Sequence, residues 1–263
     1  MRRGRFFFVH LKKTAGTSLR KRMQHHFGEA AVYPGASDGI DRIDSFFSIA
    51  RLQERMRVRG DEIQTVTGHF PLCTVDALDG EFTTLTILRE PIERTISYLR
   101  HQREWAPEDR HKPLEEIYSD PELFDGHVHN HMVKMFSLTP DEATARIDAG
   151  HGRSPWMLTR VEFTLERLER AKAKLASVDA LGLQERFEEF CDELTRRFGW
   201  NLGPPEHLMR GDPVAQSEAM ERVPDRFRSR IAEDNAMDIE LYEFGRRLYE
   251  RRRAEAARGS VAV

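Results

Sequence analysis

The sequence of 263 residues contains very little cysteine, with only Cys73 and Cys191. Two isolated cysteines form neither a disulfide framework nor a CxxC zinc pair. Both stand among apolar residues, which predicts two buried thiols in a reducing compartment. The scarcity of cysteine therefore argues against a disulfide-rich secreted protein and against a cysteine-based zinc protein.

Long apolar runs are also missing. None approaches the roughly 18 residues that a membrane-spanning helix needs. The basic N-terminus is followed by an apolar run of only Phe6 to Val9, which is too short for a signal peptide. We therefore expect a cytoplasmic protein without stable membrane insertion.

The sequence also has no excess of one charge. It contains 41 Lys and Arg residues and 44 Asp and Glu residues, which give a net charge of -3. This balance does not favour nucleic acid or an anionic membrane as partner. It still leaves room for a local basic site near the N-terminus. The basic residues there are Arg2, Arg3, Arg5, Lys12, Lys13, Arg20, Lys21 and Arg22.

The regular elements that the sequence does predict alternate between strand and helix. Apolar stretches rich in β-branched or aromatic residues predict buried strands at 5–10, 63–67, 82–88 and 178–183. Apolar residues at helical spacing predict helices over about 19–27, 91–99, 165–175 and 187–198, and one long helix over about 226–253. This alternation predicts an α/β fold with a central parallel sheet flanked by helices in three layers.

We expect residues 1–263 to form a single domain. Residues 105–160 mix Trp, Pro and His without clear periodicity, and we interpret them as a helical insertion that faces the substrate. The C-terminal residues 254–263 are expected to fray.

The stretch FFFVHLKKTAGTSL, residues 6–19, has the pattern of a phosphate-binding loop. A strand that turns tightly into a helix leaves backbone N–H groups unpaired at the positive end of the helix dipole, where an anion fits. Gly16 would let the backbone approach the anion closely, and Lys13 would add a full charge. Hydroxyl donors are available from Thr14, Thr17 and Ser18. The alternative is an ordinary capped helix with surface lysines.

The loop differs from the Walker A pattern GxxxxGK(S/T). It lacks the first glycine, and Lys13 precedes Gly16 by three residues. The strand at 82–88 is followed by Arg89, where a magnesium-dependent enzyme would have an acid. An arginine cannot help to hold a metal, but it can bind a second phosphate. The sequence therefore favours a nucleotide with two anionic groups and no metal.

Four stretches together resemble one known family. VHLKKTAGTSL is similar to the 5'-phosphosulfate loop of the PAPS-dependent sulfotransferases, in the form found in the carbohydrate (heparan 2-O-sulfotransferase-like) branch. LREPIERTISYLRH resembles the 3'-phosphate element of that family. GLQERFEEF and NAMDIELYEF resemble two later segments, and all four occur in the family's order between residue 6 and about residue 249.

The resemblance implies a P-loop-like fold and the nucleotide PAPS (3'-phosphoadenosine 5'-phosphosulfate), released as PAP, with no metal required. It implies that Arg89 and Ser97 hold the 3'-phosphate. The residues that would wrap the 5'-phosphosulfate are Lys13, Thr14, Ala15, Gly16, Thr17 and Ser18. Two departures are Glu90 in place of an aspartate and Lys12 in place of a proline. Neither the family pattern nor the loop chemistry assigns Lys12 a role.

Sulfuryl transfer to a hydroxyl needs a base and a group that stabilises the leaving phosphate. We assign the second role to Lys13. Histidine has a suitable pKa for the first, and His69 follows the strand at 63–67, at the sheet edge where open α/β sites form. His10 would support the site without touching the acceptor. The alternating histidines of GHVHNH, 126–131, are not expected to bind a metal, because no acid or cysteine cluster accompanies them.

We therefore interpret the chain as a cytoplasmic bacterial sulfotransferase that moves a sulfuryl group from PAPS to a hydroxyl of a glycan or glycolipid. Two other classes remain open: a P-loop kinase or NTPase, and a non-catalytic nucleotide- or glycan-binding protein of the same fold. The acceptor and the oligomeric state are not determined by the sequence.

Overall fold

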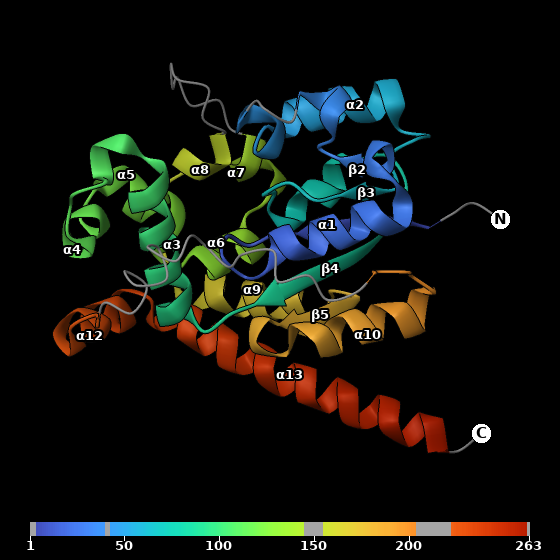
Figure 1. The fold of residues 1–263 in the computed structure, drawn as a ribbon. Helices are drawn as coiled ribbons and strands as arrows, with labels where there is room; N and C mark the ends of the chain where they lie inside the picture. Colours follow the sequence, from blue (N-terminus) through green and yellow to red (C-terminus); the bar gives the residue numbers. More distant parts are fainter. Residues whose placement is uncertain (1–3, 40–42, 145–154, 204–221, 262–263) are drawn as a thin grey trace.

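The fold was analysed in a computed structural model that describes residues 4–39, 43–144, 155–203 and 222–261. Figure 1 shows a central sheet with helices on both sides. Arg2 and Arg3 of the N-terminal basic stretch lie outside the described residues, as do residues 145–154 of the expected insertion.

The sheet has five strands in the order β2-β3-β1-β4-β5, and every pairing in it is parallel. The α/β fold with a parallel sheet between helical layers is therefore confirmed. The strands are β1 (Arg5–Val9), β2 (Val32–Tyr33), β3 (Thr65–Val66), β4 (Phe82–Leu88) and β5 (Ala180–Leu183).

Alternation along β1 explains why the sheet is covered on both faces. Phe6 and Phe8 join one apolar cluster with residues of α1 and α10. Phe7 and Val9 join a second cluster with residues of α6, α9 and α13 on the other face. A strand buried on both sides is a continuous apolar run, which is the RFFFV that the sequence shows.

Twelve α-helices surround the sheet within the described residues, with labels as in Figure 1. They are α1 (Gly16–Phe27), α2 (Ile49–Arg59), α3 (Pro91–Trp105), α4 (Leu114–Tyr118), α5 (Pro121–Leu123), α6 (His131–Ser137), α7 (Pro140–Thr144), α8 (Pro155–Leu158), α9 (Leu165–Ala176), α10 (Phe187–Phe198), α12 (Asp225–Asp234) and α13 (Ala236–Val261). The short turns of helix are η1 (Glu29–Ala31), η2 (Ala36–Asp38), η3 (Ile43–Phe46), η4 (Leu72–Ala77), η5 (Pro107–Asp109), η6 (Phe124–Val128) and η7 (Gln184–Arg186).

Most predicted elements are present, with shifted ends. The predicted strand at 82–88 has the observed bounds of β4, whereas the predicted strand at 63–67 is regular only at Thr65–Val66. The edge strand β2 was not predicted, because two residues carry no periodic signal. Cys73 and Cys191 are buried and unpaired, as expected. None of the described helices combines the length and the apolar character of a membrane span.

The expected long helix over about 226–253 is wrong, because it is broken at Asn235 into α12 and α13. The buried Asn235 amide donates to Ile231 O at the end of α12 and accepts from the backbone N–H of Asn130. A side chain that bonds the backbone in this way competes with helical hydrogen bonds. Helix α13 then continues to Val261, past residue 254, where we expected regular structure to fray.

Replacing Asn235 with alanine is expected to lower the free energy of unfolding by about 1–3 kcal/mol, because the buried backbone N–H of Asn130 loses its acceptor, whereas Ile231 O keeps the backbone N–H of residue 235. Urea denaturation of the variant measures the change. Asn201→Ala is the control, since Asn201 is exposed, and its effect should stay within about 0.5 kcal/mol. Equal effects of the two substitutions would contradict this account of the break.

The described part of 105–160 is helical, as expected, and runs from the end of α3 through α8. Its helix α6 is held by α13: the Asp238 carboxylate accepts from the backbone N–H groups of Met132 and Val133. Asn130 accepts from the backbone N–H of Asp238 in return. The polar residues of the NAMD stretch therefore fix the position of the insertion on the sheet.

Candidate functional site

Parallel strands bring the predicted site residues to one edge of the sheet. Lys13 follows β1, His69 follows β3 and Arg89 follows β4, and these three strands are neighbours. The carboxyl ends of parallel strands meet at the same edge, which is where ligands bind in open α/β sheets. The loop between β1 and α1 lies at the centre of this edge.

The backbone of this loop has the form of an anion-binding nest. Lys13 and Ala15 have φ angles of 67° and 65°, while Thr14 between them does not have a positive φ. Such alternation turns successive N–H groups toward one side. Helix α1 begins behind them without a side-chain cap and without an acid in its first turn. Its first N–H groups are therefore available to an anion.

Gly16 is required by packing against His10. A Cβ atom on Gly16 would lie 2.0 Å from Cδ2 and 2.1 Å from Nε2 of the His10 ring. The ring cannot move freely, because its Nδ1 lies 3.0 Å from Thr67 O, which can only accept a hydrogen bond. The expected reason for the glycine, approach to an anion, is therefore not the only constraint on this position.

Replacing Gly16 with alanine is expected to lower the free energy of unfolding by about 1–3 kcal/mol, because the added methyl group overpacks against His10. Thermal or urea denaturation measures the loss. Gly4→Ala is the matched control, since a Cβ on Gly4 meets no atom within 4 Å. If both variants were equally stable, the His10 contact would not be the constraint.

The three hydroxyls of the loop differ in their surroundings. Thr14 is fully buried and its hydroxyl donates to Leu11 O at 3.0 Å. A hydroxyl has one hydrogen, so Thr14 can offer a ligand its backbone N–H but not its side-chain hydrogen in this arrangement. Thr17 is exposed and Ser18 is half-buried in the first turn of α1.

Arg89 joins the end of β4 to the loop. Its Nη1 donates to Lys13 O at 3.0 Å, and burial lowers the pKa of its guanidinium. Glu93 is the strongest source of opposing charge, and its Oε1 also accepts a hydrogen bond from Arg228. The carboxylate of Glu90 accepts from the N–H groups of Ile92 and Glu93 and thereby caps α3. Arg89 therefore places a cation where a Walker-type strand end would place an acid.

Ser97 lies in the second turn of α3 and is half-buried. The structure thus places Arg89 and Ser97 at the beginning of the same helix, as the sequence predicts. Lys13 is half-buried as well, and burial lowers the pKa of its ammonium while Glu104, at the other end of α3, raises it.

His69 has a defined tautomer. Its Nδ1 lies 2.7 Å from His10 O, and a carbonyl can only accept, so Nδ1 carries the hydrogen and Nε2 carries the lone pair. The ring lies 4.2 Å from the His10 ring and stacks on Phe47 at 5.1 Å. Burial, and then His10 and Lys12, hold the pKa of His69 well below 6.5. His69 is therefore a neutral histidine with a free basic nitrogen.

His127 lies on η6, His131 is the first residue of α6 and His129 lies between the two, so none of the three is on a strand. The ring of His129 stacks on the ring of Phe124. The side chains of His127 and His131 are buried. Within the described residues, no group of three His, Cys, Asp or Glu side chains is arranged to hold a metal. His127 approaches Lys12, a contact that the sequence did not reveal because 115 residues separate the two.

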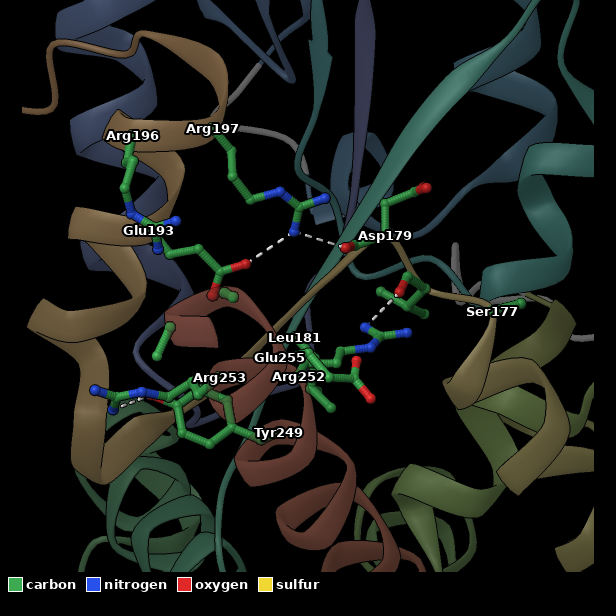
Figure 2. Close-up of a pocket in the computed structure, with 13 residues that line it drawn as sticks. Ser177, Asp179, Leu181, Glu193, Arg196, Arg197, Tyr249, Arg252, Arg253 and Glu255 are labelled. Carbon is green, nitrogen blue, oxygen red and sulfur yellow. Dashed lines mark hydrogen bonds and ion pairs between the residues drawn. The ribbon is translucent and has the colours of Figure 1, made fainter. Parts of the chain in front are cut away.

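A cavity of about 710 Å³ lies away from this edge, beside the amino end of β5 (Figure 2). Two of its arginines are already engaged: Arg197 donates to Glu193 and to Asp179 O, and Arg252 donates to Ala176 O and Val178 O. They hold α9, α10 and α13 together. We therefore assign the cavity a structural role and place the candidate site at the β1–α1 loop.

Comparison with protein-family models and with curated proteins finds no match. Among solved structures, the chain is similar to a sulfotransferase from Alicyclobacillus acidocaldarius, with 16% sequence identity and a TM-score of 0.42. The similarity covers 91% of this chain and 97% of that one. A likeness at this level assigns no activity to the chain, so the function is argued from the residues of the site.

Proposed function

We propose that this protein is a PAPS-dependent sulfotransferase that transfers a sulfuryl group to a hydroxyl of a carbohydrate, such as a glycan or glycolipid. The observation that carries the proposal is Arg89, which places a cation beside the loop where a magnesium-dependent enzyme needs an acid. A nucleotide with two anionic groups suits this arrangement without a metal. The same argument disfavours a P-loop kinase or NTPase.

The residues of the loop fit the 5'-phosphosulfate end of such a nucleotide. In this proposal the N–H groups of residues 13–18, with the Thr17 and Ser18 hydroxyls, bind the anion at the start of α1. Arg89 and Ser97 bind the 3'-phosphate. PAPS supplies the activated sulfuryl group when it is bound.

Two side chains would then act on the transfer. Lys13 stabilises the negative charge that develops on the leaving phosphate oxygen. His69 accepts the acceptor's proton at Nε2, which its Nδ1 contact with His10 O leaves free. The insertion formed by 105–160 would face the acceptor.

Transfer of radiolabelled sulfuryl from PAPS to a panel of glycans, glycolipids and small alcohols tests the proposal. We expect label in at least one acceptor, formed equally well with EDTA present, and labelling that is about 10²–10³-fold slower with the Lys13→Ala variant. Binding of PAP without transfer to any acceptor would instead favour a non-catalytic nucleotide-binding protein. A requirement for magnesium and ATP would favour the kinase class.

The Arg89→Ala variant should bind PAP about 10²-fold more weakly than wild type, because charge-assisted hydrogen bonds to a phosphate contribute about 1.5–3 kcal/mol. Titration calorimetry with PAP and with 5'-AMP, which lacks the 3'-phosphate, measures the effect. Loss of the contact with Lys13 O alone would weaken both nucleotides equally. The proposed role therefore requires a loss of preference for PAP over 5'-AMP, and an unchanged preference would contradict it.

A further inference from the structure

The Lys12 side chain lies against residues from three distant parts of the chain. Its Nζ lies 3.5 Å from Nε2 of His127, 4.9 Å from the centre of the Phe47 ring and 5.3 Å from the centre of the Tyr98 ring. The Lys12 side chain therefore extends from the loop to η6 of the insertion. The residue as a whole is half-buried.

Lys12 and His69 are neighbours at this edge through Phe47. The His69 ring stacks on Phe47, and Phe47 is one of the two rings beside the Lys12 ammonium. The charge of Lys12 also lowers the pKa of His69, which places the Lys12 amine near the proposed base.

The ionisable groups that face Lys12 are cations or histidines. They are Arg94 on α3, His127 on η6, His131 on α6, His101 on α3, and His10 and His69 beside the loop. Tyr98 contributes a ring. Within the described ranges, no carboxylate forms an ion pair with Lys12. A half-buried ammonium without an acid is disfavoured relative to the neutral amine.

Burial, and after it the charge of Arg94, lowers the pKa of Lys12 to about 7. A lysine with such a pKa is uncharged in half of the molecules at neutral pH and in most of them above it. The pKa of His69 is lower still. A base acts best when its pKa is near the working pH, which makes the amine the stronger of the two bases at this edge.

We propose that Lys12 is a second catalytic base, whose uncharged amine beside Phe47 and His127 accepts the acceptor's proton together with, or in place of, His69. This inference rests on the proposed function and deepens it. It assigns chemistry to the one loop residue for which neither the loop pattern nor the nucleotide accounts.

The step balances without a further reactant. The Nζ lone pair takes the proton of the acceptor O–H and becomes an ammonium, while the acceptor oxygen forms a bond to sulfur. The bond between sulfur and the 5'-phosphate oxygen breaks, and its electron pair leaves with PAP. The ammonium then returns its proton to water.

The first test is the titration of the Lys12 amine itself. Competitive acetylation across a pH series, read by mass spectrometry, is expected to give Lys12 an apparent pKa of about 7. Lys21, which is exposed on α1, is the internal control. If Lys12 titrated together with Lys21, the inference would be overturned, whatever the protein binds.

The second test is hydrolysis of PAPS, in which water is the acceptor and no other substrate is needed. The His69→Ala variant should keep a rate that rises with pH through about 7. Adding Lys12→Arg, which keeps the charge but cannot lose the proton, should lower that rate by about 10²-fold. Equal rates in the single and the double variant would overturn the inference.

Calorimetric binding of PAP to each variant separates the two proposals. A wild-type protein that does not bind PAP would refute the proposed function. A protein that binds PAP but whose hydrolysis does not respond to Lys12→Arg, or that does not hydrolyse PAPS at any pH, would refute only the role of Lys12. Lys21→Arg should leave binding and hydrolysis unchanged.

Discussion

Replacing Lys13 with alanine is expected to lower the rate of PAPS turnover by about 10²–10³-fold. Lys13 is half-buried at the start of the loop, and its backbone oxygen is held by Arg89. Its side chain is the cation that we place at the leaving phosphate oxygen. A charge that acts mainly on the developing negative charge affects the rate more than the binding of PAP.

The measurement is the initial rate of PAP formation at saturating PAPS, with the dissociation constant of PAP determined in parallel. Lys21→Ala is the matched control, because it removes an exposed lysine from the neighbouring helix α1. If Lys13→Ala and Lys21→Ala turned PAPS over at the wild-type rate, Lys13 would have no role in the transfer, and the assignment of the loop would be wrong.

Replacing His69 with asparagine is expected to lower turnover by about tenfold at about pH 6, where only a minor fraction of Lys12 is uncharged. Asparagine keeps a donor for His10 O but has no basic nitrogen. At that pH Lys12 is mostly charged and cannot accept a proton. The loss should therefore shrink as the pH rises through about 7, where the Lys12 amine becomes available.

The expected pH dependence of the wild-type protein follows from the same two groups. The pKa of His69 is held well below 6.5, so His69 stays in its basic form and adds no fall in rate near pH 6.5. The rate of wild type should rise through about 7 as Lys12 loses its proton. The control is His111→Asn, which replaces an exposed histidine and should leave the dependence of the rate on pH unchanged. A full wild-type rate in His69→Asn at about pH 6 would contradict the role of His69.

Local patterns predicted much of the fold, because they depend on neighbours in the sequence. The apolar run FTTLTIL gave β4 its observed bounds. Gly28 ends α1 and Gly199 ends α10 with a positive φ, as glycines at helix ends often do. Pro91 stands at the first position of α3.

The features that the sequence did not predict depend on contacts between distant residues. Asn235 breaks the last helix because its amide bonds Asn130, which is 105 residues away. Gly16 is constrained by a ring from the preceding strand end, and not by the anion alone. Lys12 had no assignable role until the structure placed His127, Phe47 and Tyr98 around it. No periodicity or spacing carries such information.

Of the candidate site, the sequence predicted the loop, Arg89 and His69 as parts of one sheet edge, and the parallel order of β3, β1 and β4 brings them there. Their chemical roles stay predictions. The free Nε2 of His69 and the contact between Arg89 and Lys13 O could be known only from the structure.

Calorimetric titration of the wild-type protein with PAP in the presence of EDTA tests the central claim most directly. We predict saturable binding at one site, unaffected by EDTA and stronger than the binding of 5'-AMP, because the loop and Arg89 hold two anionic groups without a metal. Binding of ATP only with magnesium, together with no binding of PAP, would contradict the claim.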